Sequence, residues 1–274
     1  MSAIFYYITV ALYFTATIVF IVYLFSHKEK LTLIGQYVLI GGAVSHTVTI
    51  LARWVATGHA PFTSTHESFI FYSWMLVVVT LVIMFRYSQR VIGAFVTPFA
   101  LVLLIMASFL PRDIIPLTPV LESYWLPVHV SIAFLGNAFF ALAFFLGVMY
   151  LIQQKYLKSR KLSGMFYVLP SLDLLDELNY RCLQLGFTLL TLAIITGSIW
   201  SEYALADWMS DKVRVRQVWS FIAWILYAAL LHGRLTAGWR GRKAALLSGA
   251  AFIVLIGSFL IINLVLGGAH GLTG

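Results

Sequence analysis

The sequence predicts an all-α integral membrane protein, a bundle of about eight transmembrane helices with both termini on the outer side. Three observations predict it: an apolar composition, eight apolar runs of membrane-crossing length, and a one-sided distribution of Lys and Arg. Of the 274 residues, 61% are hydrophobic and 10% are charged, and the mean hydropathy is +0.94. Soluble domains are typically about 45–50% apolar and about 25% charged. The composition therefore excludes an ordinary soluble domain.

Each apolar run is long enough to cross the hydrocarbon layer, which takes roughly 20 helical residues. Lipid leaves no partner for an open backbone, so each run is predicted to be helical. Residues 1–274 then form a single polytopic membrane domain. The longest connection, 153–182, contains a capping-like stretch at 171–177 and is predicted to form a short interfacial helix. The runs are 4–25, 32–55, 68–85, 91–110, 125–152, 183–201, 217–238 and 244–266.

The positions of Lys and Arg predict the orientation of these spans. Thirteen of the 18 basic residues fall on one side, which identifies that side as cytoplasmic. The net charge of +8 therefore reflects the orientation of the protein in the membrane, and no nucleic-acid partner is expected. The basic stretch 240–243 is expected to contact membrane lipid. The outer segments are the loops 56–67, 111–124 and 202–216 and the tail 267–274. The five basic residues of the outer side are Arg53, Arg112, Lys212, Arg214 and Arg216.

Most common site chemistries have no motif in this chain. The single cysteine, Cys182, excludes an internal disulfide, a Cys-x-x-Cys pair and a covalent haem-attachment motif. Glycine-rich nucleotide loops and the His-Glu-x-x-His zinc motif are also missing from the sequence. The candidate chemistry therefore rests on the seven histidines.

Two histidines are predicted at the outer membrane face. His129 opens the fifth run and His270 follows the eighth. Neutral imidazole is a good iron ligand, and two histidines on facing helices can hold a haem between them. The alternative is a pair of interfacial histidines bonded to main chain or water.

His46 and His232 lie within the second and seventh runs. A titratable residue inside a span is costly, so each is a functional candidate, either as a haem ligand or as a hydrogen-bonding link between helices. Their predicted depths differ by up to about 10 Å at 1.5 Å per helical residue. His59 and His66 are expected in the outer loop 56–67, where a solvated role is equally open. His27 is expected to be a solvated residue of a cytoplasmic turn.

Four stretches of the chain resemble the CcsA (ResC) component of the System II cytochrome c maturation machinery, within a superfamily that includes HemX-like proteins. One stretch begins at His46 and includes Arg53-Trp54, Gly58-His-Ala-Pro61 and Glu67. The second is Trp125-Leu-Pro-Val-His129-Val-Ser131. The other two surround His232 and His270. The resemblance covers most of the chain from about residue 40 onward.

The resemblance implies that the protein handles haem b. It implies that His129 and His270 ligate haem outside for attachment to apocytochrome c, with His232 as a ligand in the membrane and His46 as candidate for the remaining one. The same resemblance implies a ResB-like membrane partner and a place in the bacterial inner (plasma) membrane. It also implies that the chain is, at most, part of a holocytochrome c synthase. Glu67 falls in the family's conserved loop, where Thr65-His66-Glu67 replaces the usual Asn-x-Tyr-Glu.

One departure from the family concerns its tryptophan-rich external signature, which should fall between Trp200 and Trp219. Only Trp208 remains as a candidate floor for the macrocycle, and cations replace much of the motif. Arg214 and Arg216 are suited to pair with haem propionates, a protein partner or anionic headgroups. Two alternatives stay open: a b-haem membrane subunit that passes electrons to redox-complex subunits, and a HemX-like regulatory or scaffold protein.

Overall fold

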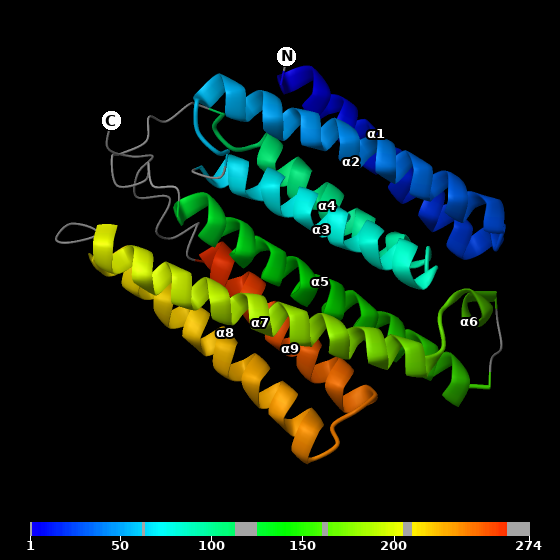
Figure 1. The fold of residues 1–274 in the computed structure, drawn as a ribbon. Coiled ribbons are helices and arrows are strands. Elements are labelled where there is room, and N and C mark those ends of the chain that lie inside the picture. Colours follow the sequence, from blue (N-terminus) through cyan, green and yellow to red (C-terminus); the bar gives the residue numbers. More distant parts are fainter. Residues whose placement is uncertain (1, 62–63, 113–124, 161–163, 205–209, 262–274) are drawn as a thin grey trace. The chain divides into compact units, whose positions relative to one another are not determined.

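The computed structural model describes all residues except 1, 62–63, 113–124, 161–163, 205–209 and 262–274. Every regular element in the described part is an α-helix, which confirms the predicted fold class (Figure 1). Six of the described helices are long and apolar enough to cross a membrane. The helices are α1 (Ser2–Ser26), α2 (Glu29–Thr57), α3 (Thr65–Tyr87), α4 (Ile92–Ser108), α5 (Trp125–Lys158), α6 (Gly164–Val168), α7 (Leu172–Ala204), α8 (Ser210–Thr236) and α9 (Arg242–Ile261).

Local sequence signals explain where the second and third helices meet their loop. α2 ends where Gly58 adopts a φ of 75° and returns its N–H to the Trp54 carbonyl at 2.9 Å. α3 begins at Ser64, whose hydroxyl accepts from the Glu67 N–H while the Glu67 carboxylate accepts from the Ser64 N–H, a complete capping box. The loop 58–64 therefore connects two well-defined helix ends.

The prediction of a separate interfacial helix at 171–177 is wrong. Ser171 caps α7, its hydroxyl accepting from the Leu174 N–H at 3.3 Å, and the helix then continues without a break to Ala204. Residues 172–182 contain neither Gly nor Pro, so nothing in them stops the helix. α7 and α8 (from Ser210) also extend into the predicted loop 202–216, and the short α6 occupies part of the connection.

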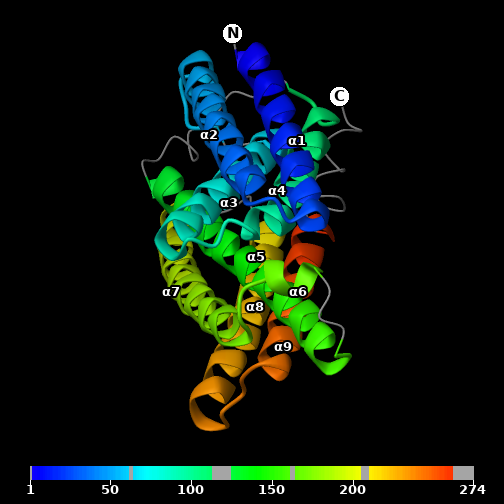
Figure 2. The ribbon, with the colours of Figure 1, turned by 90° about the vertical axis from the view of Figure 1, so that its right-hand side faces the viewer.

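The chain divides into two compact units, and unit 1 comprises residues 1–117 and 149–175. Its body is α1–α4: α1 packs on α2 and α4, and α3 packs on α4 and α2. Glycines allow close approach, since a Cβ on Gly42 would lie 2.7 Å from Tyr13 and one on Gly93 would lie 2.6 Å from Phe20. α6 lies beside α1 (Figure 2).

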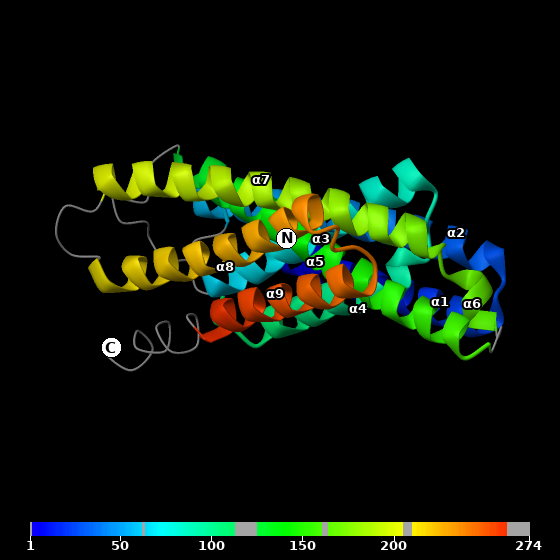
Figure 3. The same cartoon turned by 90° about the horizontal axis from the view of Figure 1, so that it is seen from below.

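Unit 2 comprises residues 118–148 and 176–274, with most of α5 and α7 and all described parts of α8 and α9. α5 contacts each of the other three helices. Its Phe140 ring stacks on Tyr227 of α8 with centroids 3.6 Å apart, and Gly147 lies against Ala245 of α9. Asn179 of α7 donates to the Ala143 carbonyl at 2.7 Å. α8 and α9 lie side by side in Figure 3.

Candidate functional site

His129 lies in the first turns of α5, in unit 2, with its imidazole against α7. Its Nδ1 is 3.1 Å from the hydroxyl oxygen of Thr196. That hydroxyl also lies 2.8 Å from the Leu192 carbonyl and 3.2 Å from the Ala193 carbonyl, both of which only accept. With its hydrogen directed to one of these carbonyls, the hydroxyl accepts from Nδ1, and the lone pair of the neutral ring then lies on Nε2. This tautomer is the one expected of a histidine that binds iron through Nε2.

Gly197 makes room for this ring. A Cβ at Gly197 would lie 2.6 Å from Cε1 of His129, closer than any real van der Waals contact. On α7, Thr196 therefore supplies a hydroxyl and Gly197 leaves space for a ring. The imidazole of His129 contacts the hydroxyl and fills that space. His129 is partly exposed.

The predicted companions of His129 are only partly within the described residues. His270 and Trp208 lie outside them. Arg214 and Arg216 fall on the helical part of α8, but their side chains lie outside the description. The pairing of His129 with His270, and the roles of the other three, therefore stay predictions.

The two intramembrane histidines have contrasting environments. His46 is fully buried in unit 1, with Nδ1 3.1 Å from the Tyr13 hydroxyl and the rings edge to face. Its Nε2 makes no hydrogen bond of normal geometry within the described part of the chain, although the Ile70 main chain lies near. His232 is exposed on α8 of unit 2. They belong to different units, and their pairing stays a prediction.

Glu67 has structural partners within unit 1. It closes the capping box of α3, and its Oε1 accepts from Nε of Arg53 on α2 at 2.9 Å, with only 3% of the side chain exposed. A role of Glu67 toward a cofactor would therefore act through the placement of Arg53.

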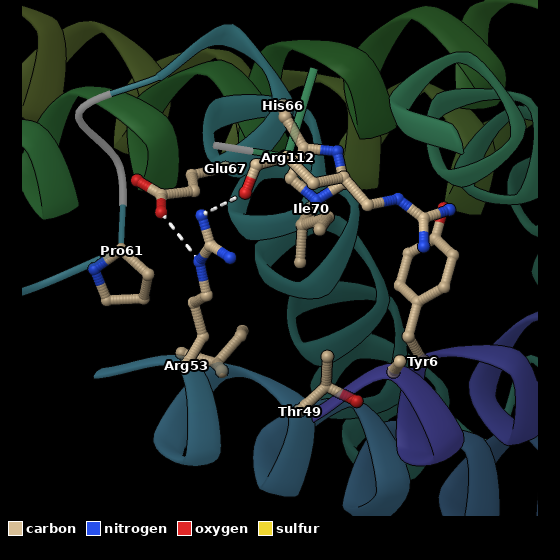
Figure 4. A pocket seen from close by; sticks show the side chains of 10 residues that line it. Tyr6, Thr49, Arg53, Pro61, His66, Glu67, Ile70 and Arg112 are labelled. Atoms are coloured by element: carbon tan, nitrogen blue, oxygen red, sulfur yellow. Dashed lines mark hydrogen bonds and ion pairs between the residues drawn. The ribbon is translucent and has the colours of Figure 1, made fainter. Parts of the chain in front are cut away.

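A pocket opens beside this ion pair, at the end of unit 1 where α1 and α3 begin and α2 and α4 end (Figure 4). Its polar lining includes two guanidinium groups, those of Arg53 and Arg112, both predicted on the outer side of the membrane. Nη2 of Arg53 donates to the main-chain carbonyl of Arg112 at 3.0 Å. The other polar groups come from Tyr6, Thr49, His66 and Glu67.

His66 is not a solvated loop residue. It lies in the first turn of α3, 7% exposed, with Nδ1 2.7 Å from the Ala107 carbonyl of α4. A carbonyl only accepts, so Nδ1 carries the hydrogen and the ring is fixed in the pocket wall. His59 is partly buried in the loop, with Nδ1 3.3 Å from the Ala60 carbonyl.

One sequence signal could have identified the pocket. Arg53 and Arg112 are two of only five basic residues on the predicted outer side, where cations are scarce. Hydropathy does not show that they meet, because they lie 59 positions apart at the ends of different helices.

Comparisons with known proteins place these units in a family. Residues 62–270 match the family model described as cytochrome C assembly protein. The chain is 34% identical over 247 residues to the cytochrome c biogenesis protein CcsA of Prochlorococcus marinus (strain MIT 9301), covering 82% of this chain and 79% of that protein. It is 30% identical over 267 residues to the protein of the same name from Guillardia theta, covering 90% and 88%.

Proposed function

Since the chain belongs to the cytochrome c assembly protein family, we propose that it binds haem b as cargo and presents it at the outer membrane face. His129 and His270 are the proposed axial ligands at that face. His232, with His46 as candidate for the remaining position, is the proposed ligand set within the membrane. Apocytochrome c receives the haem, and a ResB-like membrane protein is the proposed partner in the bacterial inner membrane.

The tautomer of His129 carries this proposal. Thr196 accepts the Nδ1 hydrogen and so directs the lone pair of the neutral ring to Nε2. A hydrogen bond on the far nitrogen also fixes the ring orientation and raises the basicity of the ligating nitrogen. The absence of a Cβ at Gly197 supports the same placement. These are the features expected of a histidine prepared to bind iron.

The remaining proposed contacts surround the macrocycle. Trp208 would stack on its face, and Arg214 and Arg216 would pair with its propionates, which suits the planar fork of arginine. Glu67 acts indirectly, because it holds Arg53 in place in unit 1.

An absorption spectrum of the purified full-length protein tests the ligand assignment. The wild type should show a haem Soret band, and the His129→Ala variant should lose most of the haem held at the outer face. His59→Ala is the matched control, since it removes a histidine from the same predicted face that is not a proposed ligand. Its spectrum should match the wild type.

The Thr196→Val variant separates the binding of iron by His129 from the positioning of the His129 ring by Thr196. Valine has nearly the same shape but cannot accept from Nδ1, so haem should still bind with weaker retention and a shifted Soret maximum. A His129→Ala spectrum identical to the wild type would refute the assignment. A wild-type protein that contains no haem and takes up none would refute the proposed function itself.

A further inference from the structure

The pocket of unit 1 has an excess of positive charge. Two guanidinium groups face it, and Glu67 is the one carboxylate among its described lining residues. The Glu67 carboxylate is already bound to Nε of Arg53. The other cation, Arg112, is therefore the group whose charge is not balanced within the pocket.

Among the described residues, the groups that contact the guanidinium of Arg112 are uncharged. Its two terminal nitrogens lie 3.4 Å from the Tyr7 hydroxyl, and its guanidinium lies 5.4 Å from the Tyr6 ring centroid and 5.7 Å from that of Tyr7. It forms no ion pair with any described carboxylate. An arginine has five N–H donors in a planar fork. Within the described part of the chain, these two long hydrogen bonds leave most of that fork available to an oxyanion.

The main chain of Arg112 is held in place from α2. Its carbonyl accepts from Arg53, and Glu67 in turn orients Arg53 through Nε (Figure 4). This chain of contacts joins α2, α3 and the segment after α4. The main-chain carbonyl at the described end of this segment is thus tied to α2, and the cation of Arg112 extends from that point of the rim.

The rest of the lining is mainly apolar. Ile50 and Ile70 lie beside Thr49, with Ala3 and Pro61 also against the pocket. The pocket also lies at the helix ends, where a membrane protein meets the headgroup layer. An anionic head attached to an apolar body matches both the cation and these walls.

We propose that this pocket binds the oxyanion of an amphiphile, a carboxylate or a phosphate, through the guanidinium of Arg112. A porphyrin propionate and an anionic lipid headgroup share this chemistry. That the oxyanion is a porphyrin propionate rests on the proposed function in haem handling. Oxyanion binding in the pocket does not rest on it, because such binding requires no iron ligand.

Metal-free protoporphyrin IX is the first probe, added to the full-length protein in phosphatidylcholine nanodiscs and followed by porphyrin fluorescence. The diacid should bind about tenfold more tightly than its dimethyl ester, which lacks the charge. Arg112→Gln should weaken diacid binding to the level of the ester, and Arg112→Lys should restore part of it. Arg86→Gln is the matched control, because Arg86 also lies over a tyrosine ring without a described carboxylate, at the other end of α3.

Phosphatidylglycerol is the second probe, with the number of lipids retained on the protein counted by native mass spectrometry. A loss specific to Arg112→Gln in the porphyrin arm identifies a carboxylate source, and one in the lipid arm identifies a phosphate source. Equal binding by wild type, Arg112→Gln and Arg86→Gln in both arms overturns the proposal. Porphyrin without iron needs no axial histidine, so a missing Soret band in the haem experiment leaves this result intact.

Discussion

Among the described residues, each unit contains one arginine–carboxylate pair with low exposure, and the two pairs differ in what surrounds them. In unit 1, Arg53 and Glu67 lie 2.9 Å apart beside an open pocket, with 18% of the arginine side chain exposed. In unit 2, Arg234 and Asp176 lie 2.8 Å apart, with 5% of the arginine and 19% of the aspartate side chain exposed. The first pair borders the pocket beside a second cation, Arg112, whereas the second, here called the enclosed pair, has its arginine buried.

The pair of unit 2 is saturated by its own surroundings. Arg234 donates to both carboxylate oxygens and to the main-chain oxygen of Asp176, and its guanidinium lies 4.5 Å from the Tyr180 ring centroid. The same carboxylate accepts from the Gly241 N–H at 2.9 Å and so ties α7 to the turn between α8 and α9. The same two functional groups thus hold a turn in unit 2, whereas in unit 1 they border a pocket and hold the main chain of Arg112.

The largest expected effect is the loss of the enclosed pair. Asp176→Asn leaves the buried cation of Arg234 without a counter-charge, which should lower the free energy of unfolding by about 3 kcal/mol. Denaturant unfolding of the purified protein in detergent measures it. Glu177→Gln is the control, since its pair with Arg181 is half exposed and should contribute only about 0.3 kcal/mol. Equal destabilisation by the two variants would show that the enclosed pair of unit 2 contributes no more to stability than the half-exposed Arg181–Glu177 pair.

A second test concerns the packing around His129 in unit 2. Gly197→Ala places a methyl group against the imidazole, so we expect a loss of about 2 kcal/mol in stability and a reduced haem content. Gly249→Ala is the matched control, because its Cβ would meet only Phe144, at 3.8 Å. Haem retention that stays normal in Gly197→Ala would contradict the placement of this ring.

Apart from the control Glu177→Gln, the smallest expected change in stability comes from the Arg53–Glu67 pair of unit 1. Glu67→Gln retains a side chain able to close the capping box but loses the charge, which should cost about 1 kcal/mol. The same substitution removes the charged acceptor that orients Arg53, and with it the support of the Arg112 main chain, so the affinity for protoporphyrin IX should fall about threefold. Asp176→Asn should leave that affinity unchanged. A rise in affinity for the Glu67 variant would show that the net charge of the pocket, rather than the placement of Arg53, governs binding.

The helices could be predicted because their signals are local. Runs of apolar residues give the spans, and Gly58 and the Ser64–Glu67 capping box give helix ends within a few residues. The interfacial helix was mispredicted because a capping sequence identifies where a helix begins but not how far it continues. Only the absence of Gly and Pro after Ser171 indicates that α7 runs on.

The sites were less accessible from sequence because they depend on contacts between helices. His129 was identified as a candidate, but its partner Thr196 lies 67 positions away and carries no motif. The sequence places Arg53 and Arg112 on the outer side, and Arg53 in a stretch that resembles the family, but nothing local indicates that one holds the main chain of the other. These side chains come together only through the packing of the helices, which residue type alone does not indicate.

The central claim is that this chain handles haem for cytochrome c assembly, and covalently bound haem in c-type cytochromes tests it most directly. The measurement is peroxidase staining for covalent haem in host cells that lack the chain, complemented with either the wild type or the His129→Ala variant. We expect staining to disappear in the deletion, return with the wild type and remain absent with the variant. Normal staining in cells without the chain would contradict the account.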